Sequence, residues 1–137
     1  MIKKIEHLGI AVNSLDEAIP LYERLLQTTC YKTESVSSEG VNTAFFQIGE
    51  AKIELLEANN QNSPIAKFLS KRGEGFHHVA FDVDDIEEEL VRLQKLDFIL
   101  LHLSPKEGAD NKRIAFLHPK STKGMLIELC QDNISKS

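Results

Sequence analysis

The chain contains an internal repeat, and this repeat limits its fold more than any other feature. Residues 7–17 read HLGIAVNSLDE and residues 78–88 read HVAFDVDDIEE, so the two segments align without a gap at an offset of 71 residues. The tripeptides 53–55 and 127–129 both read IEL and align at an offset of 74 residues. The three extra residues fall in a turn. We therefore expect one structural module that is built twice.

Each half shows the same order of expected elements. Alternating apolar residues predict a first strand at about 5–12 and its copy at about 76–83. Helical spacing follows at about 15–27 and 86–96, and each half then ends in strands that close a hairpin. A Ser or Asp stands before each helix and a Glu follows three residues later, which is the spacing of a capping box. The plan is βαβββ in both halves.

The two expected helices are amphipathic, so one side of each should lie on a sheet. Pro20 stands inside the first helix, where a proline removes a backbone hydrogen bond at a cost of about 3 kcal/mol. The apolar positions are Leu15, Ile19, Tyr22 and Leu26 in the first helix and Ile86, Leu90 and Leu93 in the second.

The length of the chain bears on how the halves combine. A half of about 65 residues buries only a modest core by itself, so we expect a single domain over residues 1–137. Module 1 should cover about 5–57 and module 2 about 76–130. Between them, a Ser-Pro pair followed by a Gly predicts a linker helix at about 63–72.

Composition narrows the classes of partner. The chain carries 16 Lys and Arg against 21 Asp and Glu, a net charge of −5, and has no Trp. These counts argue against a nucleic-acid partner and against binding to an anionic membrane. The apolar runs are too short to cross a bilayer and the start of the chain lacks a signal-peptide pattern, so we expect a cytoplasmic protein. Cys30 and Cys130 are expected to be reduced and mostly buried.

Strand alternation places two histidines beside small residues. In the first strand His7 shares a face with Gly9 and Ala11, and in its copy His78 shares a face with Ala80. Small neighbours leave open space on that face. This pattern is typical of the lining of a cavity.

The closing strands add a carboxylate in each half. Glu54 and Glu128 are each flanked by Ile and Leu, so they point away from the apolar face and either reach solvent at an edge or need a partner. If the two halves curl their sheets about a pseudo-twofold axis, these carboxylates converge with His7 and His78. Two imidazoles and two carboxylates suit a divalent ion such as Co²⁺, Mn²⁺, Ni²⁺ or Zn²⁺. The alternative is a hydrogen-bonded structural histidine and a solvated glutamate in each half.

The fold class predicted from these patterns is α+β. It consists of two βαβββ modules related by pseudo-twofold symmetry, with curled mixed sheets that form a metal-lined cavity. The other histidines do not fit the repeat: His77 has the opposite strand phase to His78, and His102 and His118 have no counterpart in the first half. We expect structural or surface roles for these three.

With these residues in place, the chain resembles the vicinal oxygen chelate superfamily of glyoxalase/bleomycin-resistance-like proteins. Within that superfamily it is most similar to the methylmalonyl-CoA epimerase family, over nearly its whole length. The segments that carry the resemblance are 6–12, 53–57, 63–68, 73–78, 114–121 and 124–129.

The resemblance implies a metal site. Ligands in the family correspond to His7, His78 and Glu128, and Glu54 stands where some members have Gln. The implied metal is Co²⁺ or Mn²⁺, with Zn²⁺ or Ni²⁺ as alternatives. The implied substrate is an acyl-CoA, and the implied assembly is a homodimer.

The resemblance also implies a reaction, the interconversion of (R)- and (S)-methylmalonyl-CoA by moving one proton through an enolate-like intermediate. This reaction needs a base on one face and an acid on the other. Glu128 matches one of them, but the strand 41–47, where some members carry a second Glu, holds no carboxylate. Glu54 or a water held by the metal could replace it. The loop 104–113 is either an exposed loop or an anion-holding one, through Lys112 or Arg113.

Two other functions remain open from the sequence. A glyoxalase I-like isomerase would act on a glutathione hemithioacetal. A member of the superfamily that binds a ligand without catalysis would be expected to lack the metal-binding set of histidines and glutamates.

Overall fold

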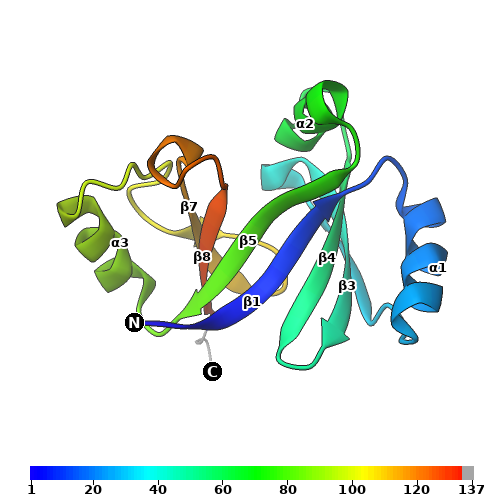
Figure 1. Cartoon of the computed structure of the whole chain (residues 1–137), viewed down its shortest axis with the longest axis horizontal. Coiled ribbons are helices and arrows are strands. Elements are labelled where there is room, and N and C mark those ends of the chain that lie inside the picture. Colours follow the sequence, from blue (N-terminus) through cyan, green and yellow to red (C-terminus); the bar gives the residue numbers. More distant parts are fainter. Residues whose placement is uncertain (134–137) are drawn as a thin grey trace. The chain divides into compact units, whose positions relative to one another are not determined.

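A computed structural model describes residues 1–133 of the chain (Figure 1). These residues form two compact units, one made of His7–His77 and the other of Met1–Glu6 together with the residues from His78 onward. The strands are β1 (Ile2–Ala11), β2 (Lys32–Val36), β3 (Val41–Ile48), β4 (Ala51–Ala58), β5 (Gly75–Val83), β6 (Lys106–Glu107), β7 (Lys112–Leu117) and β8 (Ile127–Asp132). The helices are α1 (Leu15–Leu26), α2 (Pro64–Arg72) and α3 (Ile86–Lys95), with short 3₁₀ turns η1 (Ser37–Glu39) and η2 (Pro119–Ser121).

The two halves have the same strand topology. The strand order is β2-β3-β4-β1 in one half and β6-β7-β8-β5 in the other. In each half the first and last strands are parallel, β1 with β4 and β5 with β8, whereas the middle pairs are antiparallel. The βαβββ plan expected from the repeat is therefore confirmed, element by element. The longer turn of the second half is the segment between β7 and β8 that holds η2.

Helix α1 covers one face of the first sheet, beside β3 and β4 (Figure 1). The core on this face combines strand residues such as Ala44, Phe46 and Leu55 with the helix residues Leu15 and Ile19. Apolar burial of this kind contributes about 25 cal/mol per Å² of surface removed from water. The helix side predicted from the sequence is the buried one, since Tyr22 and Leu26 belong to the same cluster.

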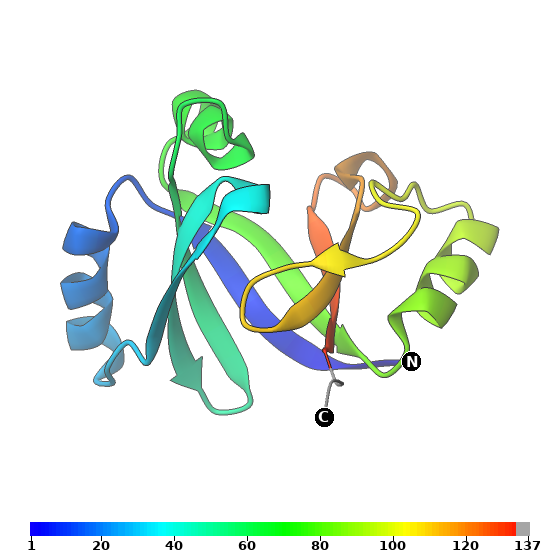
Figure 2. The same cartoon turned by 180° about the vertical axis from the view of Figure 1, so that it is seen from behind.

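Helix α3 covers the second sheet in the same way, beside β7 and β8 (Figure 2). Val83, Ala115 and Leu129 pack there against the helix, with Phe81 and Ile127 at the margin. The helix contributes Ile86, Leu90 and Leu93, as the periodicity predicted.

Both helices begin with two repeated devices. The side chains of Ser14 and Asp85 accept hydrogen bonds from backbone N–H groups one turn later, which satisfies otherwise unpaired donors. The second device was not expected from the sequence. Glu57 Oε1 accepts from the first helical N–H at Leu15 (2.7 Å), and Gln131 Oε1 accepts from the N–H of Ile86 (3.0 Å). Glu57 and Gln131 each lie three residues beyond the repeated IEL glutamate, so the closing strand anchors the helix in both halves.

Pro20 does not interrupt α1, which runs from Leu15 to Leu26. Pro20 and Asp16 are both exposed. The carbonyl that would have bonded to residue 20 is the one of Asp16, so the missing hydrogen bond lies on the solvent side of the helix, where water can replace it.

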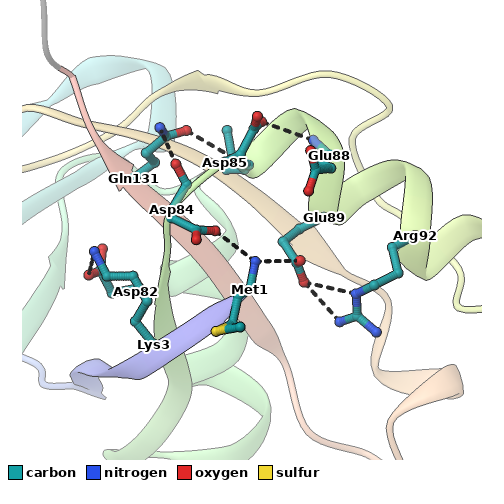
Figure 3. Close-up of polar contacts among 10 residues, drawn as sticks. Met1, Lys3, Asp82, Asp84, Asp85, Glu88, Glu89, Arg92 and Gln131 are labelled. Carbon is teal, nitrogen blue, oxygen red and sulfur yellow. Dashed lines mark hydrogen bonds and ion pairs between the residues drawn. The ribbon is translucent and has the colours of Figure 1, made fainter.

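The start of β1 was assigned to the first module from the sequence, but the structure places Met1–Glu6 with the second half. The Met1 amino group donates to Asp84 Oδ1 (2.7 Å) and Glu89 Oε2 (2.8 Å), and Lys3 Nζ lies 3.6 Å from Asp82 Oδ2 (Figure 3). These hydrogen bonds raise the pKa of the Met1 amino group, and the bond from that group lowers the pKa of the Asp84 carboxyl.

Helix α2 packs on the remaining face of the first half. Ile65 joins the buried residues Ala11, Val41 and Leu56. Ser63 caps the helix, as predicted, by accepting from the N–H of Ala66 (3.1 Å). Within residues 1–133, no helix is long and apolar enough to cross a membrane.

The contacts of Glu89 predict a pH dependence of stability. Its side chain is buried and accepts from Arg92 (2.8 and 3.1 Å), which holds the pKa of the Glu89 carboxyl below its ordinary value, with a further contribution from the Met1 amino group. A lowered pKa contributes stability that is complete above the ordinary glutamate pKa of about 4.3 and is lost as pH falls through the lower folded value.

The measurement is the free energy of unfolding in urea for the wild type and Glu89→Gln between about pH 6 and pH 3, with Glu88→Gln as a matched control on the exposed side of α3. We expect the difference between wild type and Glu89→Gln to shrink as pH falls. A difference that stays constant to about pH 3 would refute this account of Glu89.

Candidate metal and proton-transfer site

The first half brings His7 and Glu54 together. His7 lies on β1 and Glu54 on β4, and the parallel register sets Gly9 opposite Glu54, two residues beyond His7. His7 Nε2 lies 3.2 Å from Glu54 Oε1, and the two residues are only 5% and 4% exposed. A polar pair this well shielded from water requires a partner for each group.

The second half repeats this arrangement with His78 and Glu128. His78 Nε2 lies 3.1 Å from Glu128 Oε1, and both residues are buried. The register of β5 with β8 sets Ala80 opposite Glu128, which is the counterpart of Gly9 opposite Glu54. Each half therefore builds the same pair at the same register, as the repeat predicted.

The strand phases explain why these groups share a face. Ile53 and Leu55 pack in the core under α1, so Glu54 between them points to the opposite face. Ile127 and Leu129 pack under α3 and direct Glu128 likewise. The prediction that the helix side and the polar side alternate along these strands is confirmed.

A phenylalanine beside each glutamate was missed from the sequence. Phe45 pairs with Glu54 across β3 and β4, and Phe116 pairs with Glu128 across β7 and β8. The Phe116 ring meets the His78 ring edge-on, with centroids 5.9 Å apart. The signal was present, since Ala44-Phe45 and Ala115-Phe116 align at the same offset of 71 residues as the histidines.

The remaining histidines have structural contacts in the part of the chain that the structure describes. The His77 ring packs edge-on against Phe68, and His118 Nδ1 accepts from the N–H of Lys120 (2.9 Å) at η2. His102 Nδ1 accepts from the N–H of Phe116 (3.2 Å). These contacts agree with the structural roles expected for the three residues.

The two cations of the 104–113 loop are paired with carboxylates. Lys112 Nζ bonds to Asp132 Oδ1 (2.5 Å) and lies 3.6 Å from Glu6 Oε2, while Arg113 Nη2 lies 3.0 Å from Glu87 Oε2. These pairs weaken the expectation that either side chain holds an anion. In the same loop Asp110 and Asn111 both adopt a left-handed backbone (φ 57°), a conformation that Asp and Asn tolerate better than most residues.

The geometry of each pair fits metal ligation. Two ligand atoms bound about 2.1 Å from one ion, at a right angle, are about 3 Å apart. The imidazole and carboxylate atoms have this separation in both pairs (3.2 and 3.1 Å). The carboxylates could also take up or release a proton, because strand β3 (Val41–Ile48) offers no other carboxylate.

Comparison with known proteins places this chain in a family. Residues 6–116 match the model of the Glyoxalase/Bleomycin resistance protein/Dioxygenase superfamily. The mitochondrial methylmalonyl-CoA epimerase of Dictyostelium discoideum is 36% identical over 129 residues, which cover 93% of this chain and 78% of that protein. An ethylmalonyl-CoA/methylmalonyl-CoA epimerase of Cereibacter sphaeroides is 37% identical over 133 residues, covering 96% of this chain and 99% of that one.

A solved structure agrees with these sequence relatives. A variant of the methylmalonyl-CoA epimerase of Streptomyces coelicolor, in complex with 2-nitronate-propionyl-CoA, superposes with a TM-score of 0.94 at 31% identity, covering 100% of this chain and 99% of that one. The chain therefore belongs to the glyoxalase/bleomycin resistance protein/dioxygenase superfamily and, within it, to the family of the methylmalonyl-CoA epimerases.

Proposed function

We propose that this protein is a metal-dependent epimerase that interconverts (R)- and (S)-methylmalonyl-CoA. The observation that carries the proposal is the buried His–Glu pair that each half builds at the same register. The relatives named as epimerases of this substrate supply the reaction. They do not favour the glyoxalase I-like alternative, and the presence of both pairs argues against a member that binds without catalysis.

The four ligands of the proposed site are His7, Glu54, His78 and Glu128. His7, Glu54 and His78 are buried and form a group of the residue types that hold metal ions. Nitrogen and oxygen donors suit Co²⁺ or Mn²⁺, with Zn²⁺ or Ni²⁺ as alternatives. A divalent ion would supply Lewis-acid stabilisation of the negative charge that develops on the thioester oxygen when the α-proton leaves.

The same carboxylates are proposed to move the proton. Glu128 would take the α-proton on one face of the substrate and Glu54 would return a proton on the other, because epimerisation needs both faces. Their equivalent places in the two repeats support this division. The small residues opposite them, Gly9 and Ala80, leave room beside each carboxylate.

Three further properties belong to the proposal. We propose that residues 1–137 act as a single domain, that the protein is a homodimer, and that it works in the cytoplasm. The first is supported by the size of each half, since about 65 residues bury only a modest core alone. The proposed partner is a small acyl-CoA, and the acidic balance of the chain argues against a polyanionic one.

The direct test is deuterium uptake at the α-carbon of methylmalonyl-CoA in heavy water. Protein loaded with Co²⁺ or Mn²⁺ should exchange the proton, and a chelator, His7→Ala or Glu128→Ala should abolish exchange. Glu88→Ala, which removes an exposed carboxylate at the start of α3, is the matched control and should exchange at the wild-type rate. Absence of exchange by the metal-loaded wild type would refute the proposed function.

The role of Glu54 has its own test. Glu54→Gln keeps an oxygen ligand but cannot carry the proton. One enantiomer should still exchange its α-proton through Glu128, while conversion of (R) to (S) falls by about 10²-fold to 10⁴-fold. Chiral analysis of the product beside mass spectrometry of deuterium uptake separates the two. Wild-type epimerisation by Glu54→Gln would show that the second proton carrier is another group.

A further inference from the structure

His102 touches both the backbone and the ring of Phe116. It lies in the segment between α3 and β6, and it is half-buried. Its Nδ1 accepts from the Phe116 N–H (3.2 Å), and its ring centroid lies 5.9 Å from that of Phe116. A histidine nitrogen that accepts carries no proton, so a neutral His102 holds its proton on Nε2.

The two halves differ at this place, and the difference explains the bond. In the first half the strand β2 runs beside Phe45, with Lys32 opposite it. In the second half β6 has only two residues and begins opposite Ile114, so Phe116 lies beyond its reach. The irregular segment donates to the Phe116 carbonyl through the N–H of Leu101 (2.8 Å), and His102 supplies the acceptor for the Phe116 N–H.

Phe116 in turn contacts the second His–Glu pair. It lies directly opposite Glu128 across β7 and β8, and its ring meets the His78 ring at an interplanar angle of 80°. A shift of the Phe116 backbone would therefore move the ring against which His78 packs. Residues that orient metal ligands from outside the ligand set commonly change metal affinity by about 10-fold to 100-fold when they are replaced.

We propose that His102 is a positioning residue for His78 and Glu128, and that it acts by holding the N–H of Phe116 with Nδ1. This inference rests on the proposed function, because it assumes that His78 and Glu128 bind a metal. The side chain replaces the backbone carbonyl that a full-length strand would supply. It thereby gives the second half the support that β2 gives the first.

Three substitutions separate the hydrogen bond from the packing of the ring. His102→Asn places an acceptor oxygen where Nδ1 lies, His102→Gln places its amide about one bond further out, and His102→Phe keeps an aromatic ring without an acceptor. The readouts are the affinity for Mn²⁺ or Co²⁺ by competition with a chelator, and the visible spectrum of the Co²⁺-loaded protein, both measured well below the unfolding temperature of each variant.

His102→Asn should bind within about threefold of wild type, whereas His102→Gln and His102→Phe should bind about tenfold more weakly with an altered Co²⁺ spectrum. Wild-type affinity in all three variants would overturn the inference, as would an equal loss in His102→Asn. If His102→Gln and His102→Phe fail to fold while His102→Asn folds, the residue serves the fold alone and the inference is also overturned. A wild type that binds no metal would instead refute the proposed function.

Discussion

The burial of a carboxylate beside an imidazole in each half is the constraint on which the arrangement depends. An uncompensated buried charge costs several kcal/mol, so Glu54 and Glu128 need a polar partner within reach. That partner comes from a strand that runs parallel to the one carrying the glutamate, β1 for β4 and β5 for β8. Parallel strands require a long crossover, and the helix of each module lies within it, anchored by Glu57 or Gln131 three residues beyond the glutamate.

Much of this could be predicted from the sequence because the repeat and the strand alternation act on the same residues. The IEL tripeptides set the phase of the closing strands, and the phase decides that Glu54 and Glu128 leave the apolar face. The helix sides followed from spacing, and the N-caps followed from a Ser or Asp at the right distance from a Glu. Each of these rules depends on local geometry, which the amino-acid order determines directly.

The features that were missed depend on contacts between distant segments. The residues Met1–Glu6 belong with the second half because Asp84 and Glu89 bind the Met1 amino group, and no local pattern indicates this. His102 has no counterpart in the first repeat, since its role arises from the shortness of β6. Pro20 is tolerated because it lies on the exposed side of α1, and the apolar spacing of that helix could have indicated this.

The central claim is that the two halves supply one site, with a His–Glu pair from each. The most direct measurement is the number of Mn²⁺ or Co²⁺ ions bound per chain, in the wild type and in His7→Ala and His78→Ala. The account predicts one ion per chain in the wild type and loss of that ion in either variant. Two ions per chain, or one ion that remains after either substitution, would contradict it.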